Sequence, residues 1–294
     1  MATLSSSPTA SQPRQAPRQR RLWRRLRRNP RTLFGAAVLI LIVIAAIFAE
    51  PLSPYAPNVQ NLRNRLQAPS AEHWLGTDQF GRDVLSRIIF GGRVSLQVGF
   101  ISVGIALLIG GAMGLAGGYY GKKLDSVLMA IVDVLLALPA FLLALAIIAA
   151  LGPGLINVMI AVGIANIPGF ARITRSAVLT VREQDYVTAA LAAGSSDWRI
   201  ISKHVVPNAL SPVIVQVTLA LAGAILSAAG LSFLGLGAQP PTAEWGSMLN
   251  SARPYIREAH WAVTFPGLAI VITVLALNFV GDGLRDALDP RSKR

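Results

Sequence analysis

The chain contains 294 residues, of which 53% are hydrophobic and 14% are charged, and its mean hydropathy is +0.54. Because soluble proteins carry about 25% charged residues, this composition favours an integral membrane protein. The absence of cysteine excludes disulfides, thiolate metal sites and cysteine nucleophiles. The net charge of +13 would fit either a nucleic-acid partner or the loops of a membrane protein, and the positions of the charges distinguish these two explanations.

Residues 1–31 hold nine arginines and no acidic residue. Serine, proline and glutamine fill most of residues 1–16, so we expect disorder there. Leu22 and Trp23 lie among the arginines and suggest a short basic segment at a membrane surface. A nucleic-acid-binding arm is the alternative, but an apolar block follows at once. A cleaved signal peptide is disfavoured because the basic region is longer than that of a usual signal.

Six apolar blocks follow, and each is a candidate transmembrane helix. They are Leu33–Ala49, Val94–Ala116, Val127–Leu151, Leu155–Phe170, Ala209–Gly237 and Ala262–Val280. The fourth block is short and contains Pro168, which leaves its ends undefined, and Pro139 permits a kink in the third. We therefore expect an all-α integral membrane protein with six transmembrane helices and both termini on the same side.

The basic residues predict the orientation of these helices. If both termini are cytoplasmic, the inner segments hold twenty Lys and Arg residues and the outer segments hold seven, as the positive-inside rule requires. Topology thus explains the surplus of positive charge, and no nucleic-acid partner is expected. The expected organisation is a basic cytoplasmic tail (1–31), the first helix with an external segment (32–92), a five-helix core (93–281) and a cytoplasmic C-terminal tail (282–294).

The longest inner segment, residues 172–206, has apolar residues at helical spacing with an interruption at Gly194. A C-cap glycine followed by the N-cap candidates Ser195, Ser196 and Asp197 predicts a helix, a break and a second helix. Pro207 is then expected to begin the next span, because its missing N–H is harmless in a first helical turn. Small side chains at 189–194 let another backbone approach closely. The pattern alone also fits an ordinary amphipathic connector.

The run Tyr186-Val187-Thr188-Ala189-Ala190, followed at matching spacing by Gly194 and Val206-Pro207-Asn208, resembles the "EAA" loop of binding-protein-dependent ABC-transporter permeases. The resemblance implies that the loop (172–206) forms a coupling helix that sits in a groove of an ATPase subunit. The residues expected to make this contact are Tyr186, Thr188, Ala189, Ala190, Gly194, Ser195, Asp197 and Pro207. Thr188 stands where the family usually has glutamate, which puts in doubt any ion pair of that glutamate.

Other motifs resemble the dipeptide/oligopeptide branch of this family: residues 73–83, 86–87, 91–96, 235–249, 266–267 and 281–290. The resemblance implies an external docking face for a binding protein, although its glycines also fit simple turns. The residues expected at this face are Trp74, Asp78, Arg82, Asp83 and Trp245. His73 beside Glu72 and His260 near Glu258 would be an alternative metal or acid–base site, but both lack the further ligands that a metal needs.

Asp133 is the one ionisable residue well inside an apolar block. Charges in a membrane usually face a cavity or a partner, so Asp133 either contacts cargo in a translocation path or bonds to a neighbouring helix. No ATPase motif is found: the segment at 116–123 has Ala116 and Lys123 where a P-loop needs glycine and Ser or Thr. We expect a cytoplasmic turn there.

Together, the resemblance implies a permease subunit of an ATP-driven importer for dipeptides or oligopeptides in a bacterial inner membrane. The chain itself is expected to be no enzyme and to bind no cofactor. The implied partners are a second homologous permease, two ABC ATPase subunits that bind ATP and Mg, and an extracytoplasmic substrate-binding protein. Open alternatives are nickel complexes, glutathione or opines as cargo, or a secondary transporter driven by an ion gradient. A membrane enzyme is disfavoured because no nucleophile–base pair is evident.

Overall fold

The computed structural model describes residues 29–288, so the expected surface segment at Leu22 and Trp23 and the last six residues lie outside the described part. Within that part the secondary structure is helical, apart from one isolated antiparallel bridge between Thr77 and Asp83. The predicted all-α fold is confirmed.

Five long helices and one bent pair correspond to the six predicted apolar blocks. The long helices of the described part are α2 (Pro30–Ile47), α4 (Val84–Tyr120), α7 (Leu155–Arg182), α10 (Val206–Phe233) and α12 (Trp261–Leu288). All are long and apolar enough to cross a membrane, and α5 (Lys122–Leu136) with α6 (Ala140–Leu151) meets the same criteria as a bent pair. The shorter helices are α3 (Ala49–Leu52), η1 (Leu62–Asn64), α8 (Asp185–Ala192), α9 (Asp197–Ile200), η2 (Ile201–Val205), α11 (Trp245–Ala252) and η3 (Arg253–Tyr255).

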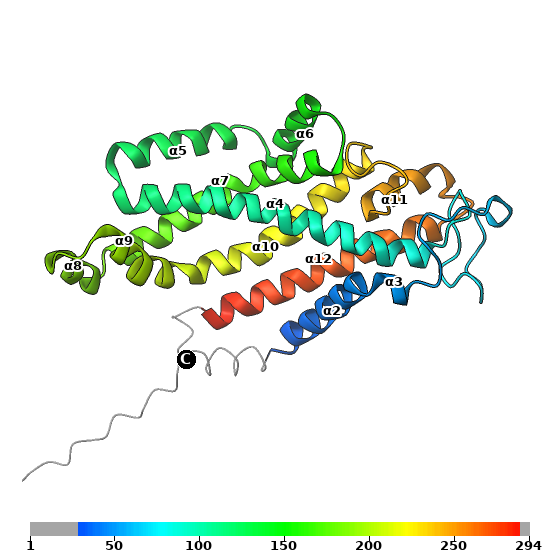
Figure 1. Cartoon of the computed structure of the whole chain (residues 1–294), viewed down its shortest axis with the longest axis horizontal. Coiled ribbons are helices and arrows are strands. Elements are labelled where there is room, and N and C mark those ends of the chain that lie inside the picture. The colour runs from blue at the N-terminus through cyan, green and yellow to red at the C-terminus, as the bar shows by residue number, and fades with distance from the viewer. Residues whose placement is uncertain (1–28, 289–294) are drawn as a thin grey trace, which may run out of the picture.

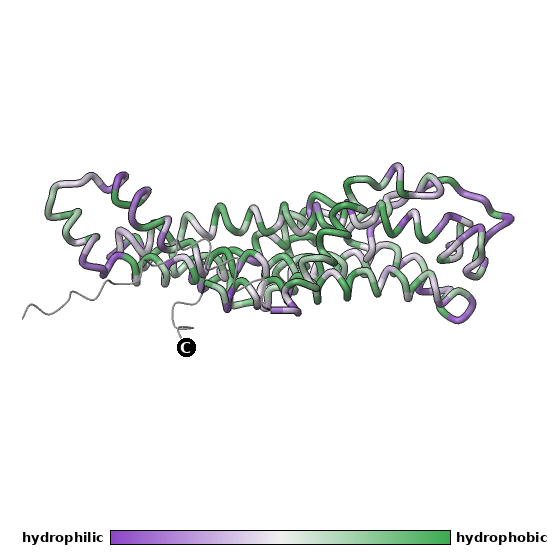
Figure 2. Tube along the Cα trace, turned by 90° about the horizontal axis from the view of Figure 1, so that it is seen from below, coloured by the Kyte–Doolittle hydropathy of each residue, from purple (hydrophilic) through white to green (hydrophobic). Residues whose placement is uncertain are grey.

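The long helices lie side by side in an elongated bundle, with α8 and α9 at one end and α3 and α11 toward the other (Figure 1). Hydrophobic residues run along the middle of the molecule, and hydrophilic residues gather toward its two ends (Figure 2). A core of buried apolar side chains, including Val98, Phe170 and Ala224, lies between α4, α7 and α10. An apolar middle with two polar ends is the distribution that a bilayer requires.

Glycines allow α4 and α7 to pack closely. A Cβ atom at Gly110 would collide with the carbonyl oxygen of Ile167, and one at Gly114 would collide with that of Ala171. The spacing of four residues on both helices repeats the same contact one turn further along. Small residues at this spacing let two backbones approach, as in many membrane helix pairs.

The third predicted block is two helices instead of one. The break at residues 137–139 turns α6 by 86° relative to α5. Pro139 lacks the N–H that would continue the helix and disfavours the helical conformation of the residue before it. The kink that Pro139 permits is therefore a complete break.

Three other helices are longer than their apolar blocks. Helix α12 continues from the predicted end at Val280 to Leu288, into the expected C-terminal tail. Helix α4 begins at Val84, ten residues before the predicted start, because Asp83 caps it by accepting a hydrogen bond of 2.8 Å from the backbone N–H of Ser86. It thus runs across the expected boundary between residues 92 and 93. Helix α7 continues through Pro168 as far as Arg182, well beyond the predicted end at Phe170.

The prediction that Pro207 begins a span is wrong. Helices α9, η2 and α10 follow one another without a gap, so the helical path starts at Asp197 and Pro207 is only the second residue of α10. The five residues of η2, directly before α10, form a π-helical turn. Such a turn accommodates a local disturbance of the helical hydrogen-bond ladder, and here it precedes the residue that cannot donate.

Candidate functional site

The segment of α8 and α9 is held on the bundle by a small apolar cluster. Val187 of α8 is fully buried against Val178, Ile200 and Val205, and Ala190 packs on the same cluster. The hydroxyl of Tyr119, at the end of α4, donates a hydrogen bond of 2.8 Å to Asp197 at the start of α9. Helices α4, α7 and α10 therefore all contribute to positioning this segment.

Gly194 ends α8 in a conformation that suits glycine. Its φ is +75°, and no heavy atom lies within 4 Å of the position of a Cβ, so the backbone conformation alone disfavours other residues. The N–H of Gly194 donates to the carbonyl of Leu191 and that of Ser195 donates to Ala190, which together form a Schellman motif. The predicted helix, break and helix are thus confirmed.

The surface of α8 and α9 carries exposed apolar side chains. Trp198 is 77% exposed, and Tyr186 and Leu191 are also exposed. A tryptophan left this open on a short helix is typical of a surface that another protein covers. We call Tyr186, Ala189, Leu191 and Trp198 the α8–α9 surface.

The residues expected to couple to an ATPase are not equivalent in the structure. Tyr186, Thr188, Ala189, Gly194, Asp197 and Pro207 are exposed, whereas Ala190 and Ser195 are half-buried. Ala190 supports the apolar cluster below the segment. A substitution at Ala190 would therefore disturb the packing, and Ala189 is the better position for testing contacts.

Asp133 has a partner on the neighbouring helix. Nη2 of Arg172 donates to Oδ1 of Asp133 at 2.7 Å, which joins α5 to α7. A second pair joins the same helices, because Nε and Nη2 of Arg175 donate to the two oxygens of Asp125, both at 2.6 Å. The expected bond of Asp133 to a neighbouring helix is therefore present.

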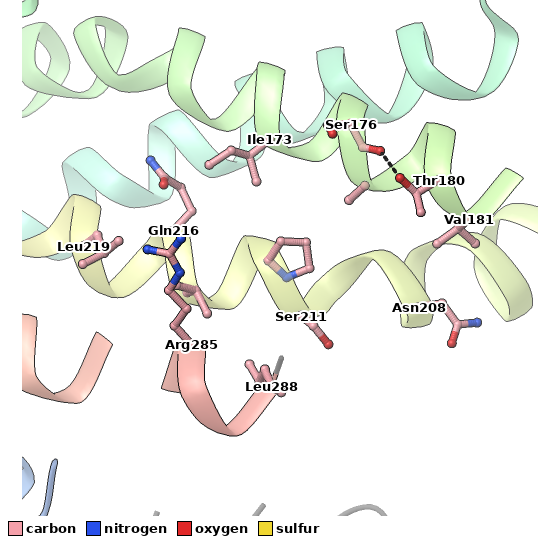
Figure 3. A pocket seen from close by; sticks show the side chains of 13 residues that line it. Ile173, Ser176, Thr180, Val181, Asn208, Ser211, Gln216, Leu219, Arg285 and Leu288 are labelled. Atoms are coloured by element: carbon pink, nitrogen blue, oxygen red, sulfur yellow. Dashed lines mark hydrogen bonds between the residues drawn. The ribbon is translucent and has the colours of Figure 1, made fainter. Parts of the chain in front are cut away.

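A cavity of about 650 Å³ lies between α7, α10 and the last turn of α12. Its polar lining residues are Ser176, Thr180, Asn208, Ser211, Gln216 and Arg285. The Arg285 side chain extends from α12 toward α10, near Gln216 (Figure 3). The cavity thus brings six polar side chains together within a mostly apolar lining, near the α8–α9 end of the bundle.

Most of the residues expected to dock a binding protein are buried at the opposite end. Asp78 accepts hydrogen bonds from the backbone N–H of Phe80 at 2.9 Å and from Nε of Arg82 at 2.7 Å. Nε of Arg87 lies 3.6 Å from the same carboxylate. These buried charges pair with one another within the segment between α3 and α4, so they order its backbone and expose little of themselves.

His73 and Asp83 belong to the same buried arrangement. Nδ1 of His73 lies 3.0 Å from Oδ1 of Asp83, whose other oxygen caps α4. The ring of Tyr55 packs against that of His73, with the centroids 4.8 Å apart and the planes tilted by 39°. His73 is thus engaged in packing, and among the described residues no group of three or more His, Asp and Glu could hold a metal ion.

Trp74 and Trp245 differ in exposure. Trp74 is 68% exposed, so its ring is open to a partner, whereas Trp245 is 3% exposed. Nε1 of Trp245 donates to the carbonyl of Ile88 at 2.9 Å, and its ring covers Gly91 and Gly92 of α4. In this conformation Trp245 fixes α11 against α4 and is not available for docking.

The structure adds functional candidates that the sequence analysis did not single out. Arg172 appeared only as one of the inner basic residues, and Trp198 was not distinguished from other apolar residues of the loop. The signal for Arg172 was its position just beyond an apolar block, on the helix next to the one that carries Asp133. The signal for Trp198 was a large aromatic residue directly after the predicted break.

A sequence profile described as "binding-protein-dependent transport system inner membrane component" matches residues 106–294. The chain belongs to this family. A second profile, for the N-terminal transmembrane domain of oligopeptide transport permease C, matches residues 19–69 of this permease. The two matches together cover the tail from residue 19, α2, the segment as far as residue 69, and the whole core from the middle of α4 onward.

Several permeases are similar to this one over nearly their whole length. The dipeptide transport system permease protein DppC of Alkalihalophilus pseudofirmus is 49% identical over 274 residues, which cover 93% of this chain and 90% of that protein. The di/tripeptide transport system permease protein DppC of Pseudomonas aeruginosa is 49% identical over 277 residues, which cover 92% of this chain and 91% of that protein. The glutathione transport system permease protein GsiD of Pectobacterium atrosepticum is 46% identical over 276 residues, with 93% and 91% covered.

Solved structures support the fold. An inward-facing structure of the MetNI methionine ABC transporter superposes with a TM-score of 0.56 at 22% identity, covering 69% of this chain and 96% of that chain. An amino acid ABC transporter with histidines gives a TM-score of 0.52 at 16% identity, covering 67% and 92%. At these identities the likeness concerns the arrangement of the helices.

Proposed function

We propose that this permease forms one half of the membrane channel of an ATP-driven importer for dipeptides and oligopeptides. The observation that carries the proposal is the 49% identity, over nearly the whole chain, to two permeases named for dipeptide or di/tripeptide transport. The proposed location is a bacterial inner membrane with both termini in the cytoplasm, because that orientation places most basic residues inside. The α8–α9 end is then cytoplasmic and the α11 end is external.

The proposed partners follow from the proposed function. A second homologous permease completes the channel, two ABC ATPase subunits bind ATP and Mg, and an extracytoplasmic binding protein delivers the cargo. This chain binds no cofactor and makes or breaks no covalent bond. Family membership favours this ATP-driven scheme over a transporter driven by an ion gradient.

The α8–α9 surface is the proposed contact with an ATPase. Its exposed Trp198 and Leu191 offer apolar area, and the small side chain of Ala189 lets a partner approach α8 closely. Closure of the ATPase dimer on ATP binding moves this segment as a unit, because Val187 and the Tyr119–Asp197 bond tie it to the bundle. The helices then change from inward-open to outward-open, and ATP hydrolysis resets them.

The external segment is the proposed contact with the binding protein. Trp74 is the exposed residue of the expected set and is proposed to touch the partner directly. Asp78, Arg82 and Asp83 are proposed to hold the shape of the segment, while Trp245 keeps α11 in place below it.

A second cargo is favoured by one observation. A glutathione transport system permease is 46% identical to this chain over 276 residues. Glutathione is itself a small peptide with free charged groups, so the same channel chemistry would serve either cargo. The ligand that co-purifies with the cognate binding protein distinguishes the two.

The experiment is ATP-dependent uptake by the complete transporter in proteoliposomes with its binding protein. The wild-type complex is expected to accumulate Ala-Ala. The variant A189R places a long charged side chain on the α8–α9 surface and is expected to abolish uptake and peptide-stimulated ATP hydrolysis, while membrane insertion is retained. The matched control S126R adds the same charge at an exposed position near the start of α5 and is expected to keep both activities.

Two results would contradict the proposal. Normal peptide-stimulated ATP hydrolysis in A189R would remove the α8–α9 surface as the coupling contact. A wild-type complex that imports another compound and no peptide would overturn the cargo.

A further inference from the structure

The two ion pairs between α5 and α7 differ in their number of hydrogen bonds and in the exposure of their side chains. Asp125 and Arg175 share two hydrogen bonds, and their side chains are 17% and 34% exposed. Asp133 and Arg172 share one hydrogen bond, and their side chains are 64% and 58% exposed. The first pair is thus largely enclosed between the two helices, whereas the second pair remains open to its surroundings.

The second pair keeps much of its binding capacity. Within the described part of the chain, one oxygen of Asp133 and the remaining N–H groups of Arg172 have no partner. A carboxylate offers two accepting oxygens, and a guanidinium offers five donors arranged to hold a carboxylate in a bidentate manner. The pair therefore presents a free acceptor next to several free donors.

These charges lie inside helices that are apolar enough to cross a membrane. Arg172 is ten residues from the end of α7, which is about 15 Å along the helix axis. Asp133 lies within the apolar block 127–151 and Arg172 directly follows the block that ends at Phe170, so the pair lies near the inner boundary of the proposed spans. Exposed charges there are costly against lipid and usually face a water-filled space or a partner. The face that carries the pair is therefore turned away from lipid in the assembled transporter.

A polar track connects the pair to the cavity. Arg172, Ser176 and Thr180 are exposed and follow one another at a spacing of four residues, which places them on one side of α7. Ser176 and Thr180 also line the cavity of about 650 Å³ (Figure 3). The pair thus lies at one end of a polar surface on α7, the end nearer the middle of the bundle, and this surface leads toward α8 and α9.

We propose that Asp133 and Arg172 bind the two charged ends of a short peptide in the translocation path. The carboxylate of Asp133 takes the α-ammonium group and the guanidinium of Arg172 takes the α-carboxylate, while the bond between the two residues opens. This proposal rests on the proposed function, because it assumes that the cargo is a peptide. The ligand class is a zwitterionic peptide with free termini, and no contact with its side chains is required.

The exchange is electrostatically balanced. One ion pair opens and two ion pairs form with the termini, so no charge is left without a partner in a medium where an unpaired charge is costly. The ends of an extended dipeptide are about 7 Å apart, and the long side chain of Arg172 lets the two groups separate to that extent. After the peptide leaves, the original pair re-forms.

The test uses a cysteine at position 176 as a reporter. The chain has no cysteine of its own, and Ser176 is exposed one helical turn from Arg172. In the complete transporter containing S176C, the measurement is the rate of modification by a water-soluble thiol reagent, with and without excess Ala-Ala. Ala-Ala is expected to slow the modification, and N-acetyl-Ala-Ala and Ala-Ala-amide are expected to protect less.

The variants D133N and R172Q, each combined with S176C, assign the two ends. Protection by Ala-Ala is expected to require about tenfold more peptide in each, since a hydrogen bond between charged groups is lost. In D133N, N-acetyl-Ala-Ala is expected to protect as well as Ala-Ala does, because the group that recognised the free amine is gone. In R172Q, Ala-Ala-amide is expected to protect as well as Ala-Ala does, because the group that recognised the free carboxylate is gone.

The control variant is D125N, which removes the closed pair between the same helices. It is expected to lower the melting temperature and to leave the protection by Ala-Ala unchanged. Equal loss of protection in D125N and D133N, or unchanged protection in D133N, would overturn the proposal. So would an unreactive cysteine in S176C, because the track would then not face water.

Failure of this inference is distinguishable from failure of the proposed function. If the wild-type complex imports Ala-Ala but protection of S176C is unchanged in D133N and R172Q, only the binding site is wrong. If the wild-type complex imports no peptide at all, the proposed cargo is wrong as well.

Discussion

At the scale of single residues, Glu244 shows how one buried carboxylate joins several helices. It is 2% exposed and accepts hydrogen bonds from the backbone N–H groups of Gly246 at 2.9 Å and Ser247 at 2.8 Å, at the start of α11. The hydroxyls of Ser95 on α4 and Ser232 on α10 also bond to it. Three helices therefore meet on one side chain that a sequence would place in a loop.

We expect the stability of the protein to depend on pH through the protonation of Glu244. Burial raises the pKa of its carboxyl group above the ordinary value of 4.5, although the hydrogen bonds act in the opposite direction. The folded state then binds this proton more tightly than the unfolded state, so the contribution of Glu244 to stability falls as the pH rises above 4.5. In E244Q this position does not titrate.

The measurement is the apparent melting temperature of the purified protein in detergent at a series of pH values from acid to neutral. The difference between E244Q and the wild type is expected to change in favour of E244Q as the pH rises. A difference that is constant with pH, or that changes in the other direction, would show that burial does not control this carboxyl group.

Residues of this kind were only partly predictable. Asp133 was identified from the sequence because a single acid in an apolar block is conspicuous, but Arg172 is 39 residues away and becomes its partner only through the packing of α5 against α7. The charges of Asp78 and Arg82 were visible, yet their burial was not, because it depends on a neighbouring loop. Composition shows that a charge exists, and packing decides what it contacts.

At the scale of helices, apolar runs predicted the middle of each element better than its ends. The ends lie in polar sequence, where a single cap such as Asp83 or a proline such as Pro139 decides where a helix begins or stops. The loop of α8 and α9 was predicted well for the same reason, since the glycine that ends α8 is a local signal. Helix α7 was underestimated because Arg172, Arg175 and Thr180 interrupt the apolar pattern beyond Phe170, although Val178 and Val181 are buried there.

The close packing of α4 against α7 leads to a second prediction. G114A adds a Cβ that collides with the carbonyl oxygen of Ala171, and it is expected to destabilise the protein by about 1–3 kcal/mol. G104A on the same helix meets nothing within 4 Å and is expected to be neutral or up to about 1 kcal/mol more stable, because alanine favours helices over glycine. Thermal unfolding of the two variants in detergent measures both effects, and equal melting temperatures would contradict this account of the interface.

At the scale of the whole molecule, polarity is distributed along the long axis of the bundle. Hydrophilic residues concentrate at its two ends (Figure 2). The sequence predicted an apolar middle because its apolar blocks are long enough to span a bilayer, while the orientation stays a prediction from the positive-inside rule. The 86° bend between α5 and α6 could not be predicted in the same way, since a proline permits a bend without setting its angle.

The proposed orientation is testable because the chain lacks cysteine. V59C lies in the exposed segment between α3 and η1, and S196C lies in the exposed break between α8 and α9. In intact spheroplasts, a membrane-impermeant thiol reagent is expected to label V59C at once and S196C only after permeabilisation. The reverse pattern would invert the topology, and with it the side on which each partner is expected.

The unbroken helical path from Asp197 to Phe233 gives the molecule a mechanical lever. The nine residues of α9 and η2 form a short arm beside the α8–α9 surface, and the 28 residues of α10 form a long arm that reaches toward the other end. If the chain pivots where η2 joins α10, the ratio of the arms converts a small displacement of the short arm into one roughly three times larger at the far end. A modest stroke at one surface is thereby amplified across the thickness of the bundle.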